Sequence, residues 1–370
     1  MPEIQSAPWN LGLRIAFRFC FVYFGLFCVV TQILGGLFPI PKIEVPDLAS
    51  LPPVRQIVLW TANHIFAIKQ PLLYADTGSG DRTFDWILIC CLLICAALAT
   101  MVWSALDRRR ANYDSLHRWF RLFVRFALAS ELILYGMDKA VPLQMPFPFL
   151  TRLVEPYGNF SPMGNLWAFI GASRPYEMFV GCAEMLGGIL LFFPHTTMFG
   201  ALVALADLIQ VFMLNMTYDV PVKLLSFHLL LMALFLLAPD LPRLCGFFFL
   251  NRPTDSSTQY ELFRSRRRNR IALAAQVLLG LWIVGVNGYN AQSAWNTYGG
   301  GRPKSSLYGI WNVTQISADA KSAVLAYDRW RRPIFEFPAN MAVQQVGMSG
   351  KIADAFLERL ATVGKAMGAK

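Results

Sequence analysis

Four ionisable residues lie inside long apolar stretches of the chain, where a charged side chain is costly. They are Glu131, Glu184, Asp207 and His228. Carboxyl and imidazole groups bind and release protons, and ionisable groups within such stretches are functional candidates by default. We predict that the four meet one another and Arg125 and form a catalytic site that handles protons. The alternative is a buried polar network that only fixes the register of neighbouring helices.

The apolar stretches are long enough to cross a membrane. Of the 370 residues, 55% are apolar and only 15% are charged, against about 25% charged residues in soluble domains. Near-continuous apolar runs cover residues 12–38, 86–106, 119–141, 176–193, 197–217, 222–238 and 271–291. Most of them reach the roughly 17–25 residues that a spanning helix needs. The sequence therefore predicts an all-α polytopic membrane protein with about seven transmembrane helices.

Arginine clusters set the expected orientation of these helices. They lie at the start of the first run, between the second and third runs, and between the sixth and seventh. With seven helices all three places fall on one side, which the positive-inside rule makes cytoplasmic. We expect a plasma (inner) membrane protein with a cytoplasmic N-terminus and an external or periplasmic C-terminal segment. The net charge of +10 then reflects topology and contact with anionic membrane lipid rather than nucleic-acid binding.

The run 119–141 raises a question about how its charges are paired. Arg125 and Lys139 follow one stripe of the expected helix, whereas Glu131 lies on another face near its middle. At about 100° of rotation per residue, neither cation can reach Glu131 on its own helix. A partner must come from another helix, and His228 and Lys223 are the candidates.

Polar and aromatic residues near the expected outer end of the bundle could hold a ligand. The predicted ligand-binding residues are Arg125, Tyr135, Asp138, Lys139, Trp167, Tyr218, Asp219 and Lys223. Trp167 belongs to SPMGNLWAFIG, which predicts a short helix that Ser161 caps, Pro162 begins and Gly171 ends. No metal site is predicted, because the four histidines lie in different segments without paired-ligand spacing.

The C-terminal part has a different pattern. Residues 292–306 are rich in Gly, Asn and Ser and read as a linker, and SLYGIWNVTQIS, RRPIFEFP and MAVQQV have strand-like content. From Ser349 onward, Ile352, Phe356 and Leu360 follow helical spacing. We expect a small β-rich external segment that ends in an amphipathic helix.

Two stretches resemble a known family. RFALASELILYGMDK, from Arg125 to Lys139, resembles the opening helix of the DoxX family, which begins with arginine and closes with Gly-x-x-Lys. AEMLGGILLFF, at 183–193, is similar to the second helix of that family, with its acidic residue and Gly-Gly. The resemblance implies a four-helix membrane domain linked to quinone or thiol redox chemistry. The plan of extra helices and an external tail also resembles, distantly, membrane proteins of the vitamin K-dependent carboxylase type.

The expected organisation follows from these patterns. The segments are 1–111, two transmembrane helices with an outer interfacial segment; 112–240, the DoxX-like domain; 241–270, a basic cytoplasmic loop; 271–291, the seventh helix; and 292–370, an external linker and β-rich tail.

The expected function is that of a quinone-linked oxidoreductase subunit. The buried acids would exchange protons with a quinone held between the helices of the DoxX-like domain. The chain has no haem-ligand pair, cysteine cluster or nucleotide motif, so a redox protein partner would supply the electrons. Two alternatives stay open: a non-enzymatic membrane scaffold or accessory subunit, and a lipid-handling or transport protein.

Overall fold

The computed structural model describes residues 8–43, 45–68, 72, 79–254, 261–315, 330–345 and 352–354. Contacts divide the chain into two compact units, each made of two segments. One unit, called here the helical bundle, comprises Met1–Ala140 and Val180–Ala291. The other, called here the mixed unit, comprises Val141–Phe179 and Gln292–Lys370. This division differs from the expected order of segments, because residues 141–179 group with the C-terminal part rather than with the DoxX-like stretch.

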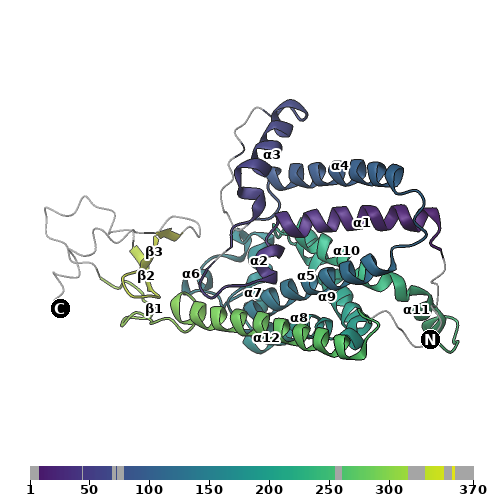
Figure 1. Cartoon of the computed structure of the whole chain (residues 1–370). Helices are drawn as coiled ribbons and strands as arrows, with labels where there is room; N and C mark the ends of the chain where they lie inside the picture. Colours follow the sequence, from purple (N-terminus) through teal and green to yellow (C-terminus); the bar gives the residue numbers. More distant parts are fainter. Residues whose placement is uncertain are drawn as a thin grey trace. The chain divides into compact units, whose positions relative to one another are not determined.

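Long helices build the bundle (Figure 1). They are α1 Leu11–Val30, α2 Ile33–Leu37, α3 Pro52–His64, α4 Thr83–Leu106, α5 Asp114–Ala140, α8 Arg174–Leu191, α9 Thr197–Thr217, α10 Lys223–Leu237, α11 Leu241–Phe248 and α12 Arg266–Thr297. Helix α1 packs against α4, and α9 packs against α10 as a hairpin. A helix lies at each of the seven apolar runs.

Among the residues that the structure describes, five helical segments are long and apolar enough to cross a membrane: α1, α4, Pro194–Thr217 with α9, Lys223–Phe248 with α10 and α11, and α12. Helices α5 and α8 occupy the other two predicted runs, but every 18-residue stretch of each carries more than two charged residues. The chain is therefore a helical membrane protein with five spans by length and composition, against about seven predicted.

The charges of α5 follow from its position inside the bundle. Every side chain from Val124 to Ile133 is buried, so neighbouring helices cover α5 on all of its faces. A helix in that place needs no continuous apolar surface, since its polar groups can be paired with protein groups instead of facing lipid. Helix α5 consequently carries several of the interior polar residues of the bundle, among them Arg125, Ser130 and Glu131.

The mixed unit combines short helices with a sheet. Its helices are α6 Leu150–Leu153 and α7 Pro162–Gly171. The Ser161 side chain accepts a hydrogen bond from the Gly164 N–H at 3.0 Å, Pro162 opens α7 and Gly171 is its last residue. The predicted short helix and its cap are thus confirmed.

The sheet contains β1 Gly309–Ile310, β2 Trp330–Phe335, β3 Met341–Gln345 and β4 Ile352–Asp354. All neighbours pair antiparallel in the order β1-β2-β3-β4, with Ile310 opposite Ile334 and Val343 opposite both Pro333 and Ala353. The predicted strand content is confirmed in RRPIFEFP and MAVQQV.

Two predictions about the C-terminal part are wrong. Helix α12 continues to Thr297, so the linker expected from residue 292 begins later than predicted. The amphipathic helix expected from Ser349 is replaced at Ile352–Asp354 by β4, because β3 offers an open edge for backbone pairing. Its remaining residues, from 355 to 370, lie outside the described residues.

Candidate functional site in the helical bundle

Helices α5 and α8 approach each other closely because glycines lie at their contact. A Cβ atom at Gly136 would lie 2.6 Å from Met185 Cγ, and one at Gly181 would lie 2.5 Å from the Gly136 carbonyl oxygen. One at Gly188 would lie 3.1 Å from the Ala129 carbonyl oxygen. Small residues let helix backbones meet in this way inside membranes. The contact brings polar side chains of the two helices within hydrogen-bonding reach.

A buried ion pair joins the two helices. Lys139 Nζ lies 2.5 Å from Glu184 Oε2 and donates also to the Tyr135 carbonyl oxygen at 3.3 Å. Lys139 is only 5% exposed and Glu184 only 4%. Asp138 on α5 and Asp207 on α9 are both within electrostatic range of this pair. The structure therefore brings together predicted residues from three helices, with more carboxyl groups than cations.

Glu131 lies about two helical turns before Lys139 on α5 and is fully buried. Its Oε2 atom accepts a hydrogen bond from Gln32 Nε2 at 2.7 Å, and the same nitrogen donates to Tyr135 Oη at 3.1 Å. A Cβ atom at Gly36 would lie 2.8 Å from Glu131 Oε1, so α2 packs directly on this carboxyl group. Among the described residues, Oε1 has no hydrogen-bond partner. Asp207 Oδ2 is a second buried oxygen of this kind.

The partner predicted for Glu131 is wrong. Neither His228 nor Lys223 pairs with it; the partner is Gln32, at the end of the first apolar run. His228 Nε2 lies 2.6 Å from Tyr23 Oη, and its ring stacks on Phe27 at 4.1 Å between centroids. His228 is thereby part of the α1–α10 contact.

Arg125 is also bound elsewhere than expected. It donates to Thr197 Oγ1 at 3.2 Å and makes a short hydrogen bond to Gln276 Oε1. These two hydrogen bonds of Arg125 join α5 to α9 and α12, and they involve neither Glu131 nor Glu184. Its Nε atom is a buried donor without a partner among the described residues.

The α9–α10 turn holds its own charges. Lys223 Nζ lies 2.7 Å from Asp219 Oδ1 and 3.7 Å from Asp81 Oδ2. Asp81 also accepts the backbone N–H groups of Lys223 and Leu224 at 2.8 Å and 2.9 Å, so it caps α10. Lys223 therefore pairs within the turn instead of pointing down the bundle or toward headgroups.

Two of the aromatic residues predicted to bind the ligand belong to other elements. Tyr218 follows the end of α9 and is 37% exposed. Trp167 lies in α7, within the mixed unit. The predicted wall of Tyr135, Trp167 and Tyr218 around a ligand therefore stays a prediction.

Three polar residues inside the bundle were not predicted from the sequence as site residues. Gln32 and Tyr23 are single polar positions in an apolar run, which periodicity does not distinguish from packing. Arg18 resembles an arginine of the positive-inside pattern, yet it is 1% exposed. It donates to Tyr113 Oη at 2.9 Å and to the Asp107 carbonyl oxygen at 2.7 Å. The Tyr113 hydroxyl donates in turn to Asp107 Oδ2, which holds the pKa of Asp107 below its ordinary value.

An apolar groove of about 650 Å³ lies in the bundle beside α2, α5 and α12. Leu34 and Leu37 line it from α2, Phe126 lines it from α5, and Gln276 and Leu279 line it from α12. Helix α2 therefore contributes to both features, since Gly36 contacts Glu131 while Leu34 and Leu37 face the groove. A groove of this size and lining suits a lipid-soluble molecule.

Part of the chain is similar to a curated protein. The uncharacterized protein YwoB of Bacillus subtilis (strain 168) is 33% identical over 148 residues, which are 40% of this chain and 91% of that protein. No family model and no solved structure matches the chain. The match thus covers nearly the whole of the shorter protein, and much of this chain lies outside it.

Proposed function

We propose that this chain, which belongs to the family of the uncharacterized protein YwoB of Bacillus subtilis, is a DoxX-like membrane protein that binds a quinone in its helical bundle and exchanges protons with it. The observation that carries the proposal is Glu131, a fully buried carboxyl group with one oxygen free of hydrogen bonds among the described residues. A protonated carboxyl group donates to a quinone carbonyl, and a carboxylate accepts from a quinol hydroxyl.

The surroundings of Glu131 support this reading. The groove along α2, α5 and α12 would hold the apolar tail, and Arg125 Nε is a buried donor on the same helix as Glu131. The two DoxX-like stretches fall in α5 and α8, the helices that meet at Gly136 and Gly181. The cluster of Lys139, Glu184 and Asp207 would relay protons toward the end of α5.

The chemistry requires a second protein. Reduction of a quinone to a quinol takes up two electrons and two protons; the buried acids would supply the protons, and a redox protein partner would supply the electrons. We place the chain in the plasma membrane, with its N-terminus cytoplasmic and its C-terminal part external, as the arginine clusters indicate.

The test is quinone binding by purified protein in an uncharged detergent. We expect the wild-type protein to retain quinone through purification, and a short-chain quinone to bind saturably. Glu131→Gln should fold, because an amide still bonds to Gln32. It should bind the quinone up to about tenfold more weakly, because an amide N–H is a weaker donor to the quinone carbonyl than a carboxylic acid O–H. Glu261→Gln, at an exposed acid outside the cluster, is the matched control. A protein that neither retains nor binds quinone would contradict the proposal.

The groove also favours a second candidate, a lipid-handling or transport protein. It is lined almost wholly by apolar side chains and is large enough for an acyl chain. In this case Leu37→Trp, which fills the groove, would slow transfer of a labelled phospholipid between vesicles, while Glu131→Gln would leave that transfer unchanged. Quinone binding separates the two candidates. The third alternative is a scaffold. In that case the complex that contains the chain would stay active with either Leu37→Trp or Glu131→Gln.

A further inference from the structure

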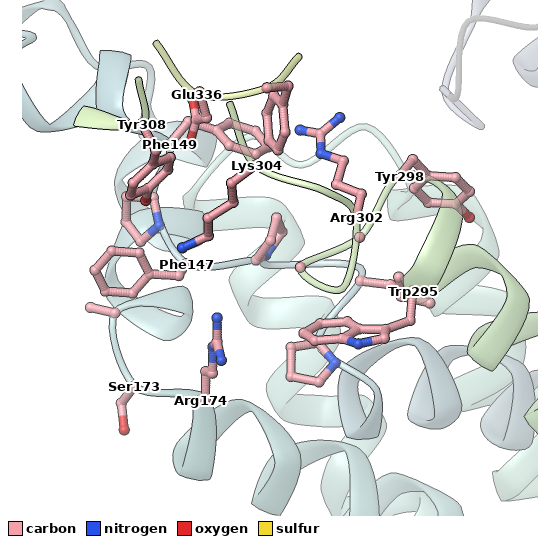
Figure 2. A pocket seen from close by; sticks show the side chains of 18 of the residues that line it. Phe147, Phe149, Ser173, Arg174, Trp295, Tyr298, Arg302, Lys304, Tyr308 and Glu336 are labelled. Carbon is pink, nitrogen blue, oxygen red and sulfur yellow. The ribbon is translucent and has the colours of Figure 1, made fainter. Parts of the chain in front are cut away.

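The mixed unit contains a cavity of about 610 Å³ that the bundle site does not involve (Figure 2). Three stretches of chain line it, residues 142–149, 172–175 and 295–308, and Glu336, directly after β2, lines it as well. Its volume lies within the range of small-molecule sites, which is about 300–1,000 Å³. The cavity is therefore large enough for a whole small molecule.

Cations outnumber acids in this cavity. Arg174, Arg302 and Lys304 line it, against one acid, Glu336. Figure 2 shows Arg174 and Lys304 pointing into the cavity from opposite sides. None of the three cations forms an ion pair with another residue in the part of the chain that the structure describes. Glu336 already accepts the Leu150 N–H at 3.1 Å.

Aromatic rings supply the rest of the wall. Arg174 lies over Trp295 at 5.9 Å from the ring centroid, and Lys304 lies over Tyr308 at 4.0 Å. These contacts hold the cations in place without neutralising their charge. Phe147 and Phe149 add apolar surface on which a flat or aliphatic body can pack.

We propose that this cavity binds an organic phosphate ester, with Arg174 and Lys304 on the phosphate and the aromatic rings on the organic part. The guanidinium fork of arginine matches phosphate oxygens in two parallel hydrogen bonds, and lysine adds a point charge. The same chemistry occurs in the headgroup of an anionic phospholipid and in a soluble phosphate ester. The site does not depend on the quinone proposal, because the residues of the two sites do not overlap.

The test uses the full-length protein in an uncharged, phosphate-free detergent. Binding is followed by calorimetry and by tryptophan fluorescence, to which Trp295 contributes. The probes are glycerol 3-phosphate, inorganic phosphate, and mixed micelles with phosphatidylglycerol or with phosphatidylcholine. We expect saturable binding of glycerol 3-phosphate or of phosphatidylglycerol. If only the lipid binds, the source is a headgroup; if the soluble ester binds, it is a free metabolite.

Variants connect the binding to the cavity. Arg174→Gln and Lys304→Gln should each weaken binding about tenfold, through the loss of a charge-assisted hydrogen bond. Arg331→Gln removes an equal charge from an exposed position on β2 that does not line the cavity, and it should bind like the wild type. The proposal fails if no phosphate probe binds, or if all three variants weaken binding equally. Binding of inorganic phosphate alone would overturn the assignment of an organic ligand.

Discussion

Lys139 and Glu184 form a buried ion pair between two helices. Each is almost completely buried, and they lie 2.5 Å apart at the α5–α8 contact. Removing one partner of such a pair leaves an unpaired charge in a medium that solvates it poorly. The acidic neighbours Asp138 and Asp207 make the loss of the lysine worse than the loss of the glutamate.

We therefore expect Lys139→Met to lower the free energy of unfolding by about 3–5 kcal/mol. Glu184→Gln should cost less, because it also reduces the acidic surplus. Lys223→Met is the control: its nearer partner Asp219 is exposed, and Asp81 lies farther away at 3.7 Å. Exposed pairs contribute about 0–1 kcal/mol. Thermal unfolding in detergent measures all three. Equal losses for Lys139→Met and Lys223→Met would contradict this account of the buried pair.

Glu336 gives the phosphate cavity a dependence on pH. Burial raises its pKa above the ordinary value of 4.5, although the Leu150 N–H, Arg302 and Lys304 act in the opposite direction. As the pH falls from neutral through this raised pKa, Glu336 gains a proton and the cavity loses its single acid charge. A phosphodiester keeps its negative charge over this range, so it meets less repulsion in the cavity once Glu336 is protonated.

Binding of phosphatidylglycerol micelles should accordingly strengthen as the pH falls from 7 toward 4.5. Glu336→Gln should bind more tightly than the wild type at pH 7 and show a flat profile. Titrations of both proteins over this range measure the effect, and Arg331→Gln should keep the wild-type slope. A wild-type profile that is flat, or that falls with acid, would exclude Glu336 as the titrating group.

At the same scale, sequence reasoning found which residues are buried but not how they pair. Glu131, Glu184 and His228 were identified because charges are rare in apolar runs, and each is buried. Their partners depend on which helices touch and at what rotation. Gln32 lies 99 positions from Glu131, and a single glutamine near a helix end carries no periodic signal.

At the scale of elements, α5 and α8 can approach closely only because glycines lie at their contact. Gly136 and Gly181 oppose each other, and a Cβ atom at Gly181 would enter the space of the Gly136 carbonyl oxygen. The neighbour is backbone, so it cannot turn away as a flexible side chain would. The two helices would have to separate, and the Lys139–Glu184 pair would lengthen with them.

We expect Gly181→Ala to destabilise the protein by about 1–3 kcal/mol or more through this overpacking. Gly285→Ala on α12 is the control, because nothing lies within 4 Å of its added Cβ atom and alanine favours the helix by about 1 kcal/mol. Unfolding temperatures of the two variants should thus move in opposite directions. A neutral Gly181→Ala would show that the helices can separate freely.

The existence of the helices was predictable, because apolar length alone determines it. A helix lies at each predicted run, and even the Ser161–Pro162 start of α7 was readable from local capping chemistry. Element ends were less predictable: α12 continues past residue 291 because Asn and Ser residues near its end tolerate helix when packed. The strand β4 depends on the edge of β3, a non-local partner that helical spacing in the tail cannot reveal.

At the scale of the whole molecule, the arginine clusters and the span count make separate predictions about topology. A chain that crosses the membrane five or seven times has its two ends on opposite sides, because both numbers are odd. The two counts differ by whether α5 and α8 are both spans. The two counts differ only for the connection between α5 and α8, residues 141–179. With seven spans this connection is external, and with five it is cytoplasmic.

The hydrogen bond from the Leu150 N–H to Glu336 supports the seven-span count, which stays a prediction. It joins residues 141–179 to the C-terminal part within one compact unit, and a unit folded together occupies one aqueous compartment. Both segments of that unit can lie on the same side only if α5 and α8 both cross the membrane, as the seven-span prediction has it. A cysteine placed by Gly158→Cys, where nothing lies within 4 Å, should react with an impermeant maleimide on intact cells, as should Ser305→Cys. Labelling of Ser305→Cys alone would mean that the two segments are separated by the bilayer and that the sheet forms without them.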